Sequence, residues 1–285
     1  MKILEVIQNT SKFFEKRGIE SPRLQIELLL AHFLCMKRMD LYMQFERELS
    51  EAELGPLRDA VKKRSEGVPL QHLTGDTGFY GEIFKVSPSV LIPRPETEIL
   101  IEHASGFIKA LDAPRILDVG TGSGVIAVML AKLHPSADIT AVDISSEALL
   151  VARINAERVL GPDHKVRFVE GDLLLSVEGP FDMIISNPPY IASEVIPTLS
   201  REVQHDPKLA LDGGVDGLQI IRDLIMQSSS KLKDSGRLFV EIGYDQSKQC
   251  LELLAQGGYE NSQVIQDLTG RDRVITGGWG SSTKS

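Results

Sequence analysis

The chain has 285 residues, of which 42% are hydrophobic and 25% charged, and its formal net charge is −9. This composition is that of an ordinary soluble globular protein with room for one large domain and a smaller one. The acidic balance argues against broad binding of a nucleic-acid backbone, which relies on basic surface. Cys35 and Cys250 lack metal-ligand spacing, so we expect reduced, buried thiols, no metal and a cytoplasmic location. No stretch reaches transmembrane length.

The first part of the chain carries helix signals. Apolar residues recur at helical spacing through residues 1–75. Pro22 follows Ser21 where it can occupy the first position of a helix, and Ser50–Glu53 has the capping-box pattern. We predict a small helical bundle with its own core. We expect its basic run, Lys62–Arg64, to be a solvated helix face; the alternative is part of a docking surface for a partner.

Residues 76–94 have a different character, with glycines among aromatic and β-branched residues. This pattern predicts a β-hairpin that links the helical bundle to the rest of the chain. Pro95 then sits where a helix can begin, and acidic residues fill the first turn. We expect that helix to end near Ala110.

From Arg115 onward, strand and helix patterns alternate, which predicts a doubly wound sheet with right-handed crossovers. Polar residues from Gly280 onward are expected to form a disordered tail. The predicted strands are 116–119, 138–142, 166–169, 181–185 and 237–242, with 259–265 and 273–276 closing the sheet. The predicted helices are 125–133, 147–160, 218–232 and 246–256.

The stretch Phe181–Tyr190 ends a buried strand in a rigid polar turn. Pro188 and Pro189 lack a backbone N–H, so the strand cannot continue. The side-chain carbonyl of Asn187 and the backbone carbonyl of Pro188 are two fixed acceptors that can hold both hydrogens of an –NH2 group, and Tyr190 can cover a planar group. Such a clamp suits methyl transfer to an amide or aromatic amine. The other interpretation is an ordinary polar turn.

A glycine-rich turn, Gly120–Gly124, lies between a predicted strand and helix, and glycines there let a ligand approach the backbone. Asp143 ends the next strand, where an acidic residue commonly binds two ribose hydroxyls. A dinucleotide fingerprint needs glycine at the sixth position, which is Val125. The turn instead resembles the S-adenosylmethionine loop of class I methyltransferases. In that family the acidic residue before the loop, Asp118 here, lies near the methionine part, and Gly171–Asp172 lies near the adenine.

With Asn187–Tyr190 added, the chain resembles methyltransferases of planar –NH2 groups. These include adenine-N6 DNA methyltransferases and the HemK/PrmC-type protein-(glutamine-N5) methyltransferases of peptide chain release factors. The second resemblance covers nearly the whole chain and includes Val90–Glu98, in which Ile92–Glu98 is far more specific than Asn187–Tyr190. It departs at Asp206, where the family usually has glutamate, and at Leu173, where some relatives have an aromatic. Further matching segments are Pro69–Gly75, Phe79–Gly81, Ala210–Gly214, Asp216–Leu218 and Asp267–Arg273.

The resemblance implies a class I S-adenosylmethionine-dependent methyltransferase, an α/β protein with a Rossmann-like doubly wound seven-stranded sheet. It implies methylation of the glutamine N5 in the Gly-Gly-Gln motif of class 1 release factors. Residues 1–75 would recognise this substrate, and 95–285 would form the catalytic domain. We expect a monomer that binds neither nucleic acid nor membrane.

The same resemblance assigns the site residues. The expected cofactor-binding residues are Gly120, Thr121, Gly122, Ser123, Gly124, Asp143, Asp172, Leu173 and Asn187. The expected substrate-binding residues are Asn187, Pro188, Pro189 and Tyr190, of which Asn187, Pro188 and Tyr190 are also the expected catalytic residues. Arg94, Glu96 and Thr97 are expected to shape the methionine end.

Two alternatives stay open. An adenine-N6 methyltransferase acting on DNA or RNA would need basic grooves and an element that holds a flipped base, and the chain shows neither clearly. A non-catalytic binding module could keep the fold as a scaffold. The intact glycines, Asp143 and Asn187 argue against that second alternative.

Overall fold

The computed structural model describes residues 1–280, which form two compact units. The first comprises Met1–Gly75 together with Ser200–His205, and the second comprises Asp76–Leu199 and the chain from Asp206 onward. The segment Ser200–His205 was not part of the predicted helical domain, and the predicted linker lies within the second unit. Apart from Gly280, the tail that we expect to be disordered lies outside the described residues.

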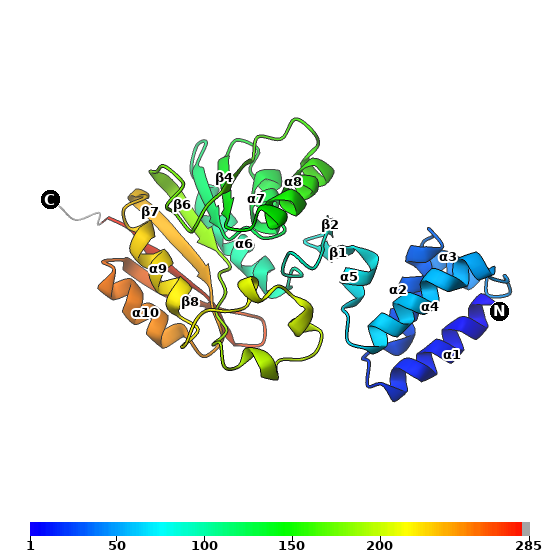
Figure 1. Cartoon of the computed structure of the whole chain (residues 1–285). Helices are drawn as coiled ribbons and strands as arrows, with labels where there is room; N and C mark the ends of the chain where they lie inside the picture. Colours follow the sequence, from blue (N-terminus) through cyan, green and yellow to red (C-terminus); the bar gives the residue numbers. More distant parts are fainter. Residues whose placement is uncertain (281–285) are drawn as a thin grey trace. The chain divides into compact units, whose positions relative to one another are not determined.

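The first unit is helical, as the spacing of apolar residues predicts (Figure 1). Ser50 caps the fourth helix: its Oγ accepts from Glu53 N at 3.4 Å, and Glu53 Oε2 accepts from Ser50 N at 2.9 Å. Buried aliphatic side chains and Phe14 form a core that belongs to this unit alone. Cys35 is exposed, so the expectation of a buried thiol is wrong there. Its helices are α1 (Ile3–Lys16), α2 (Pro22–Phe33), α3 (Arg38–Met43), α4 (Glu51–Ser65) and α5 (Leu70–Thr74), with the 3-10 helix η2 (Val203–His205) from the later segment.

Arg64 explains why the later segment belongs to the helical unit. Its side chain is only 2% exposed, so the expectation of a solvated face is wrong at this position, although Lys62 and Lys63 are exposed. The guanidinium donates to Gln25 Oε1 at 2.9 Å, to Val68 O at 3.2 Å and to the carboxylate of Glu202. A buried charge needs such partners, so the ion pair holds Ser200–His205 in place.

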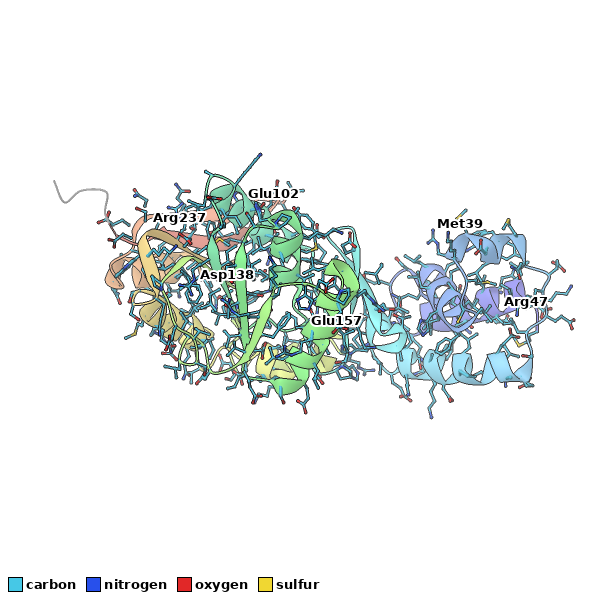
Figure 2. The ribbon with its side chains drawn as sticks, turned by 90° about the horizontal axis from the view of Figure 1, so that it is seen from above. Met39, Arg47, Glu102, Asp138, Glu157 and Arg237 are labelled. Atoms are coloured by element: carbon cyan, nitrogen blue, oxygen red, sulfur yellow. The ribbon has the colours of Figure 1, made fainter. Side chains whose placement is uncertain are left out.

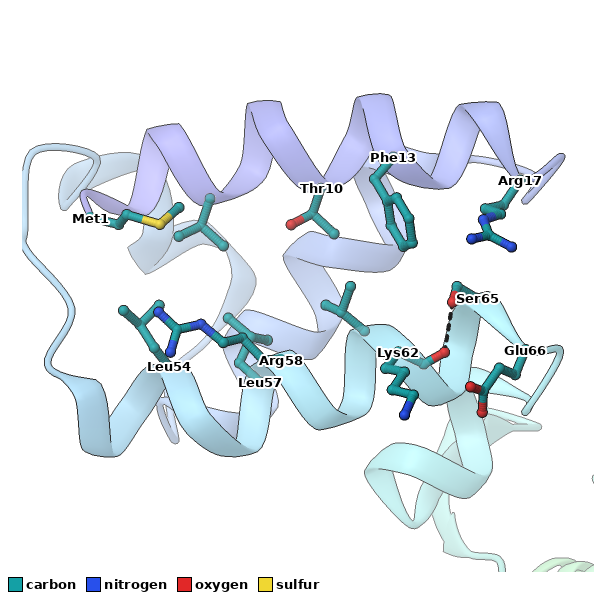
Figure 3. A pocket seen from close by; sticks show the side chains of 12 residues that line it. Met1, Thr10, Phe13, Arg17, Leu54, Leu57, Arg58, Lys62, Ser65 and Glu66 are labelled. Atoms are coloured by element: carbon teal, nitrogen blue, oxygen red, sulfur yellow. Dashed lines mark hydrogen bonds between the residues drawn. The ribbon is translucent and has the colours of Figure 1, made fainter.

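A cavity of about 380 Å³ lies between α1 and α4 within the same unit. Figure 3 shows Phe13 pointing into it from α1, with Arg17, Ser65 and Glu66 at one end and Lys62 pointing outward from α4. The guanidinium of Arg17 lies 5.4 Å from the centre of the Phe13 ring. The cavity is therefore apolar inside and mostly basic at its edge.

The second unit is built on a seven-stranded sheet with the order β5-β4-β3-β6-β7-β9-β8. Strands β5, β4, β3, β6 and β7 are parallel, and β9 runs antiparallel to both of its neighbours. Two short antiparallel strands precede the sheet, as predicted for the hairpin. The strands are β1 (Asp76–Phe79), β2 (Glu82–Lys85), β3 (Arg115–Val119), β4 (Asp138–Asp143), β5 (Arg167–Glu170), β6 (Phe181–Ser186), β7 (Leu232–Glu241), β8 (Glu260–Gln266) and β9 (Asp272–Gly278).

Helices cover both faces of this sheet, so the strands between them are buried on both sides (Figure 1). One face packs under α6, α7 and α8, and the other packs under α9 and α10. These helices are α6 (Glu96–Ile108), α7 (Val125–Leu133), α8 (Ser146–Leu160), α9 (Gln219–Ser228) and α10 (Ser247–Gln256), with the 3-10 helices η1 (Ile196–Thr198) and η3 (Lys208–Ala210) in the loop after β6.

The helix predicted over 218–232 is too long, because α9 ends at Ser228 and Leu232 begins β7. Leu232 continues the helical spacing of Leu224 and is 6% exposed, so the pattern alone does not separate the two states. Pairing with Phe181 of β6 decides in favour of the strand. Among the described residues, no helix is both long enough and apolar enough to cross a bilayer.

Candidate active site

A cavity of about 550 Å³ opens at the carboxyl ends of the parallel strands. Ligands bind at this edge of an open α/β sheet, and the volume suits a small organic molecule. Of the expected site residues, Glu96, Gly124, Pro188 and Tyr190 do not line it. Those that do are Gly120, Thr121, Gly122, Ser123, Asp143, Asp172, Leu173, Asn187, Pro189, Arg94 and Thr97.

The glycine turn after β3 gives the cavity one of its walls. Gly120 and Gly122 have φ of +69° and +55°, and a Cβ on either would meet nothing within 4 Å. Their backbone is therefore open to a ligand. Gly124 differs, because a Cβ there would lie 3.0 Å from the Cβ of Ala152. Gly124 serves the packing of α7 against α8 at the point where α7 begins.

Asp118 accepts hydrogen bonds that stabilise this turn from its buried side. The side chain is fully buried, and its Oδ2 accepts from Thr121 Oγ1 at 2.6 Å and from Ala127 N at 3.1 Å. Burial raises the pKa of Asp118 to about 7, against the lowering effect of these hydrogen bonds. Asp118 thus connects the turn to the first residues of α7 and is itself shielded from solvent.

Asp143 joins the turn to the end of β4. Its Oδ2 accepts from Gly122 N at 2.8 Å, and its Oδ1 accepts from Ser145 N at 2.9 Å. Burial raises the pKa of Asp143, although the backbone hydrogen bonds oppose this. A carboxylate has about four lone-pair sites, so both oxygens can still accept a hydroxyl. This is the chemistry that a ribose diol requires.

The turn after β5 supplies the third wall. A Cβ on Gly171 would lie 2.4 Å from Ser176 Oγ, so the tight turn needs glycine. Asp172 is exposed, and Leu173 has a φ of +47°, a strained value for a leucine. Strain of this kind gathers at ligand sites. The half-buried Leu173 side chain lies on the cavity wall.

The Asn187 amide is held by a chain of two hydrogen bonds. Its Nδ2 donates to Thr97 Oγ1 at 3.1 Å, and Thr97 Oγ1 donates to Glu241 Oε2 at 2.7 Å. Thr97 and Glu241 are each 2% exposed. Burial, assisted by nearby Glu96, raises the pKa of Glu241 to about 7 against the opposing hydrogen bond from Thr97. The Asn187 nitrogen thus faces Thr97, which leaves the carbonyl oxygen free on its other side.

Sequence reasoning missed Glu241. The available signal is a carboxylate in the apolar run Leu238–Ile242 at the carboxyl end of a central strand. A charge in such a run is costly unless it has a partner.

The backbone after Asn187 is fixed by the later loop. Ile191 N donates to Leu211 O at 3.0 Å, and Gly213 N donates to Ile191 O at 2.8 Å. A Cβ on Gly217 would lie 2.5 Å from Tyr190 O, so this close approach needs glycine. Pro188 is buried, and the Tyr190 ring packs against the core under α9 and α10. Burial raises the pKa of Tyr190, which keeps the phenol neutral.

Arg94 brings a positive charge to the cavity wall. Its Nη2 lies 2.6 Å from Asp206 Oδ2, and the Asp206 side chain is 0% exposed. Ile92 N also donates to Asp206 Oδ1 at 3.4 Å. Glu96 faces Arg273 instead, at 3.8 Å, outside the cavity lining. Of the three residues expected at the methionine end, Arg94 and Thr97 thus reach the cavity.

Two family models match the chain. One is described as PrmC N-terminal domain and matches residues 5–75. The other is described as Methyltransferase small domain and matches residues 95–214. The first model thus falls within the helical unit and the second within residues 95–285.

Two solved structures share the fold of the chain. A methyltransferase from Pyrococcus furiosus has a TM-score of 0.52 at 22% identity, covering 72% of this chain and 92% of its own. The 16S rRNA N2 G1207 methyltransferase of Thermus thermophilus, in complex with AdoMet and guanosine, has a TM-score of 0.52 at 16% identity, covering 72% of this chain and 49% of its own. The predicted class I methyltransferase fold is confirmed.

Curated relatives match over almost the full length. The release factor glutamine methyltransferase of Chlorobaculum tepidum is 41% identical, with 96% of each chain covered. The protein of the same name from Moorella thermoacetica is 42% identical, covering 90% of this chain and 92% of its own. The predicted resemblance is confirmed: the chain belongs to the release factor glutamine methyltransferase family of enzymes.

Proposed function

We propose that the chain transfers a methyl group from S-adenosylmethionine to the side-chain nitrogen, N5, of the glutamine in the Gly-Gly-Gln motif of class 1 release factors. The observation that carries this proposal is the Asn187 amide. It lines the same cavity as the glycine turn and Asp143, and its nitrogen donates a hydrogen bond to Thr97. Its carbonyl oxygen is therefore available to a ligand –NH2 group.

The residues around the cavity fit S-adenosylmethionine. The open backbone at Gly120 and Gly122 accommodates a close ligand, and the Asp143 carboxylate suits the two ribose hydroxyls. Leu173 offers an apolar surface for the adenine, with Asp172 beside it to accept from a polar edge. Arg94 suits the carboxylate of the methionine part.

Asn187 and Pro188 act on the substrate amide. Its two N–H groups donate to the Asn187 side-chain oxygen and to the Pro188 carbonyl oxygen, which orients the nitrogen lone pair. Both acceptors also stabilise the positive charge that grows on the nitrogen. Tyr190, held neutral, lies outside the cavity lining with its ring against the core, so its contact with the planar amide stays a prediction.

When bound, S-adenosylmethionine would supply an electrophilic methyl group to the lone pair of the amide nitrogen, and its sulfur would keep the electron pair of the former S–C bond as a neutral thioether. The methylated nitrogen then loses one proton to water and becomes a neutral secondary amide. A strong base is not required, because alkylation makes this proton acidic.

We assign recognition of the folded release factor to the helical unit. It has its own core and a cavity between α1 and α4, and it contributes none of the residues of the second cavity. The proposed substrate also implies action in the cytoplasm, where translation ends. We expect the chain to act as a monomer, because one copy contains both the cofactor residues and the amide clamp.

The test is methylation with a labelled methyl donor. Purified release factors and double-stranded DNA are incubated separately with the enzyme, and the label is located by mass spectrometry. We expect label on the Gly-Gly-Gln glutamine and none on a release factor in which glutamate replaces that glutamine. Label on adenine alone would instead support the adenine-N6 alternative, and no transfer to either substrate would contradict the proposal.

A further inference from the structure

The buried carboxylate of Glu241 determines the direction of the two hydrogen bonds that connect Glu241, Thr97 and Asn187. A threonine hydroxyl has one hydrogen to donate. Thr97 gives it to Glu241 Oε2 at 2.7 Å, because an ionised carboxylate can only accept. The Thr97 oxygen must therefore accept from Asn187, and it does so from Nδ2 at 3.1 Å.

We infer that Glu241 is a positioning residue which, through Thr97, keeps the carbonyl oxygen of Asn187 turned toward the substrate. The inference rests on the proposed function, since it assigns a role within the same amide clamp. The side-chain amide of an asparagine can rotate by about 180° with little change in shape, which exchanges the positions of its oxygen and nitrogen. A turned amide would present a donor to the substrate –NH2 group, and the clamp would lose an acceptor.

A purely structural role explains the carboxylate less well. A buried carboxylate is costly, and a glutamine of the same shape could fill the position without a charge. The charge has two consequences that a glutamine lacks. The charge allows hydrogen bonds to be donated only from Asn187 to Thr97 and from Thr97 to Glu241. Its negative potential also favours the positive charge growing on the substrate nitrogen.

Titration of Glu241 offers an independent readout. The charged groups that act on it are Glu96, at the start of α6, and Arg273, on β9, while Thr97 and Asn187 donate toward it. A protonated Glu241 could donate to Thr97, and Thr97 could then donate to the Asn187 oxygen. Activity should therefore rise with pH as Glu241 ionises, with a midpoint near its pKa of about 7.

The experiment compares Glu241→Gln, Thr97→Val and Thr97→Ser with the wild type on whole release factor. We expect Glu241→Gln and Thr97→Val to lower kcat by ~100-fold or more, the effect of losing one oriented polar group. Calorimetric titration should give a Kd for S-adenosylmethionine within a few-fold of wild type. Thr97→Ser, which keeps the hydroxyl, should retain most of the activity. In Glu241→Gln, the inflection in the kcat–pH profile should disappear.

Ser228→Ala is the matched control for loss of a buried hydrogen bond. Ser228 is 0% exposed, and its Oγ lies 2.6 Å from Tyr259 Oη, in the second unit and outside the cavity lining. This variant should lower the Tm and leave kcat unchanged. Equal losses of kcat in Ser228→Ala and Glu241→Gln would overturn the inference, because general destabilisation would then explain both.

The orientation of Asn187 can also be observed without turnover. NMR of the side-chain amide, labelled with 15N, should show a hydrogen-bonded NH2 group in the wild type and a solvent-exchanging one in Glu241→Gln. An unchanged signal together with wild-type kcat in Glu241→Gln would reject the inference while leaving the proposed function intact. Absence of methyl transfer by the wild type would instead reject the proposed function.

Discussion

At the scale of single residues, the proposed mechanism depends on the direction of the Asn187 amide. Thr97 accepts from the amide nitrogen, so the carbonyl oxygen would be the atom that binds the substrate. Asp143 has a comparable double role, since it accepts from the backbone of Gly122 and Ser145 and still has lone pairs for ribose. Both residues can therefore be tested by substitution.

Asn187→Ala should leave the protein folded and lower kcat by ~10²–10³-fold, the effect of removing one well-placed polar group from a reaction site. The affinity for S-adenosylmethionine should fall less than kcat does. Single-turnover methylation of release factor and calorimetry measure the two quantities. Turnover within a few-fold of wild type would show that Asn187 does not orient the amide.

Asp143→Ala should weaken S-adenosylmethionine binding by ~10–100-fold, because hydrogen bonds to a charged partner contribute about 1.5–3 kcal/mol. Asp138→Ala is the matched control on the same strand. Asp138, labelled in Figure 2, is the first residue of β4, whereas Asp143 is the last; it does not line the cavity and pairs with Arg167 at 2.9 Å. Exposed ion pairs contribute little to stability, so the Asp138→Ala variant should stay folded. Its Kd for S-adenosylmethionine should stay at the wild-type value. Equal affinities in both variants would mean that the ribose binds elsewhere.

At the scale of elements, the turn between β3 and α7 depends on a carboxyl group that is buried beneath it. The pKa of Asp118 rises from an ordinary value of 3.8 to about 7. Between these two values the folded chain binds more protons than the unfolded chain, so the free energy of unfolding falls as pH rises. The contribution is complete below about pH 4 and is lost as pH rises through about 7.

Urea unfolding at pH 6 and pH 8 tests this coupling. The wild type should lose more stability over this interval than Asp118→Asn does, because asparagine can still accept from Thr121 and Ala127 but does not ionise there. Other titrating groups affect both proteins alike, so the difference between the two slopes reports Asp118. Parallel slopes would show that Asp118 titrates alike in the folded and unfolded chains.

At the scale of the whole molecule, the two units divide the proposed work. Binding of the release factor by the helical unit would raise the effective concentration of its glutamine at Asn187. Removal of residues 1–75 should therefore leave the affinity for S-adenosylmethionine within a few-fold of wild type. It should lower kcat/KM on whole release factor by orders of magnitude, and it should change little on a short Gly-Gly-Gln peptide, a poor substrate for both forms.

Truncation also removes Arg64 and leaves Glu202 without its partner. Full-length Glu202→Ala is the matched control for this loss, and circular dichroism checks that each form is folded. Steady-state kinetics then give kcat/KM of each form on the release factor and on the peptide. Equal losses on protein and peptide would make the helical unit a stabiliser of the catalytic unit.

The sequence by itself determined the order of elements in the second unit. Buried strands, helical spacing and glycine turns are local patterns, and they locate β3 to β6 and the residues at their ends to within one residue. Because parallel strands place their carboxyl ends at one edge, Gly120, Asp143, Asp172 and Asn187 could be brought together without coordinates. That reasoning needs only topology.

Only the tertiary structure decided which atoms meet. Glu241 and Thr97 are 144 positions apart in the chain, and Arg64 and Glu202 are 138 apart, so no local pattern joins either pair. Gly124 looks like its neighbours in the turn, yet its contact with Ala152 sets it apart. The end of α9 was likewise decided by pairing of Leu232 with Phe181. Contacts between distant segments depend on how packed elements place their side chains, which spacing along the chain does not encode.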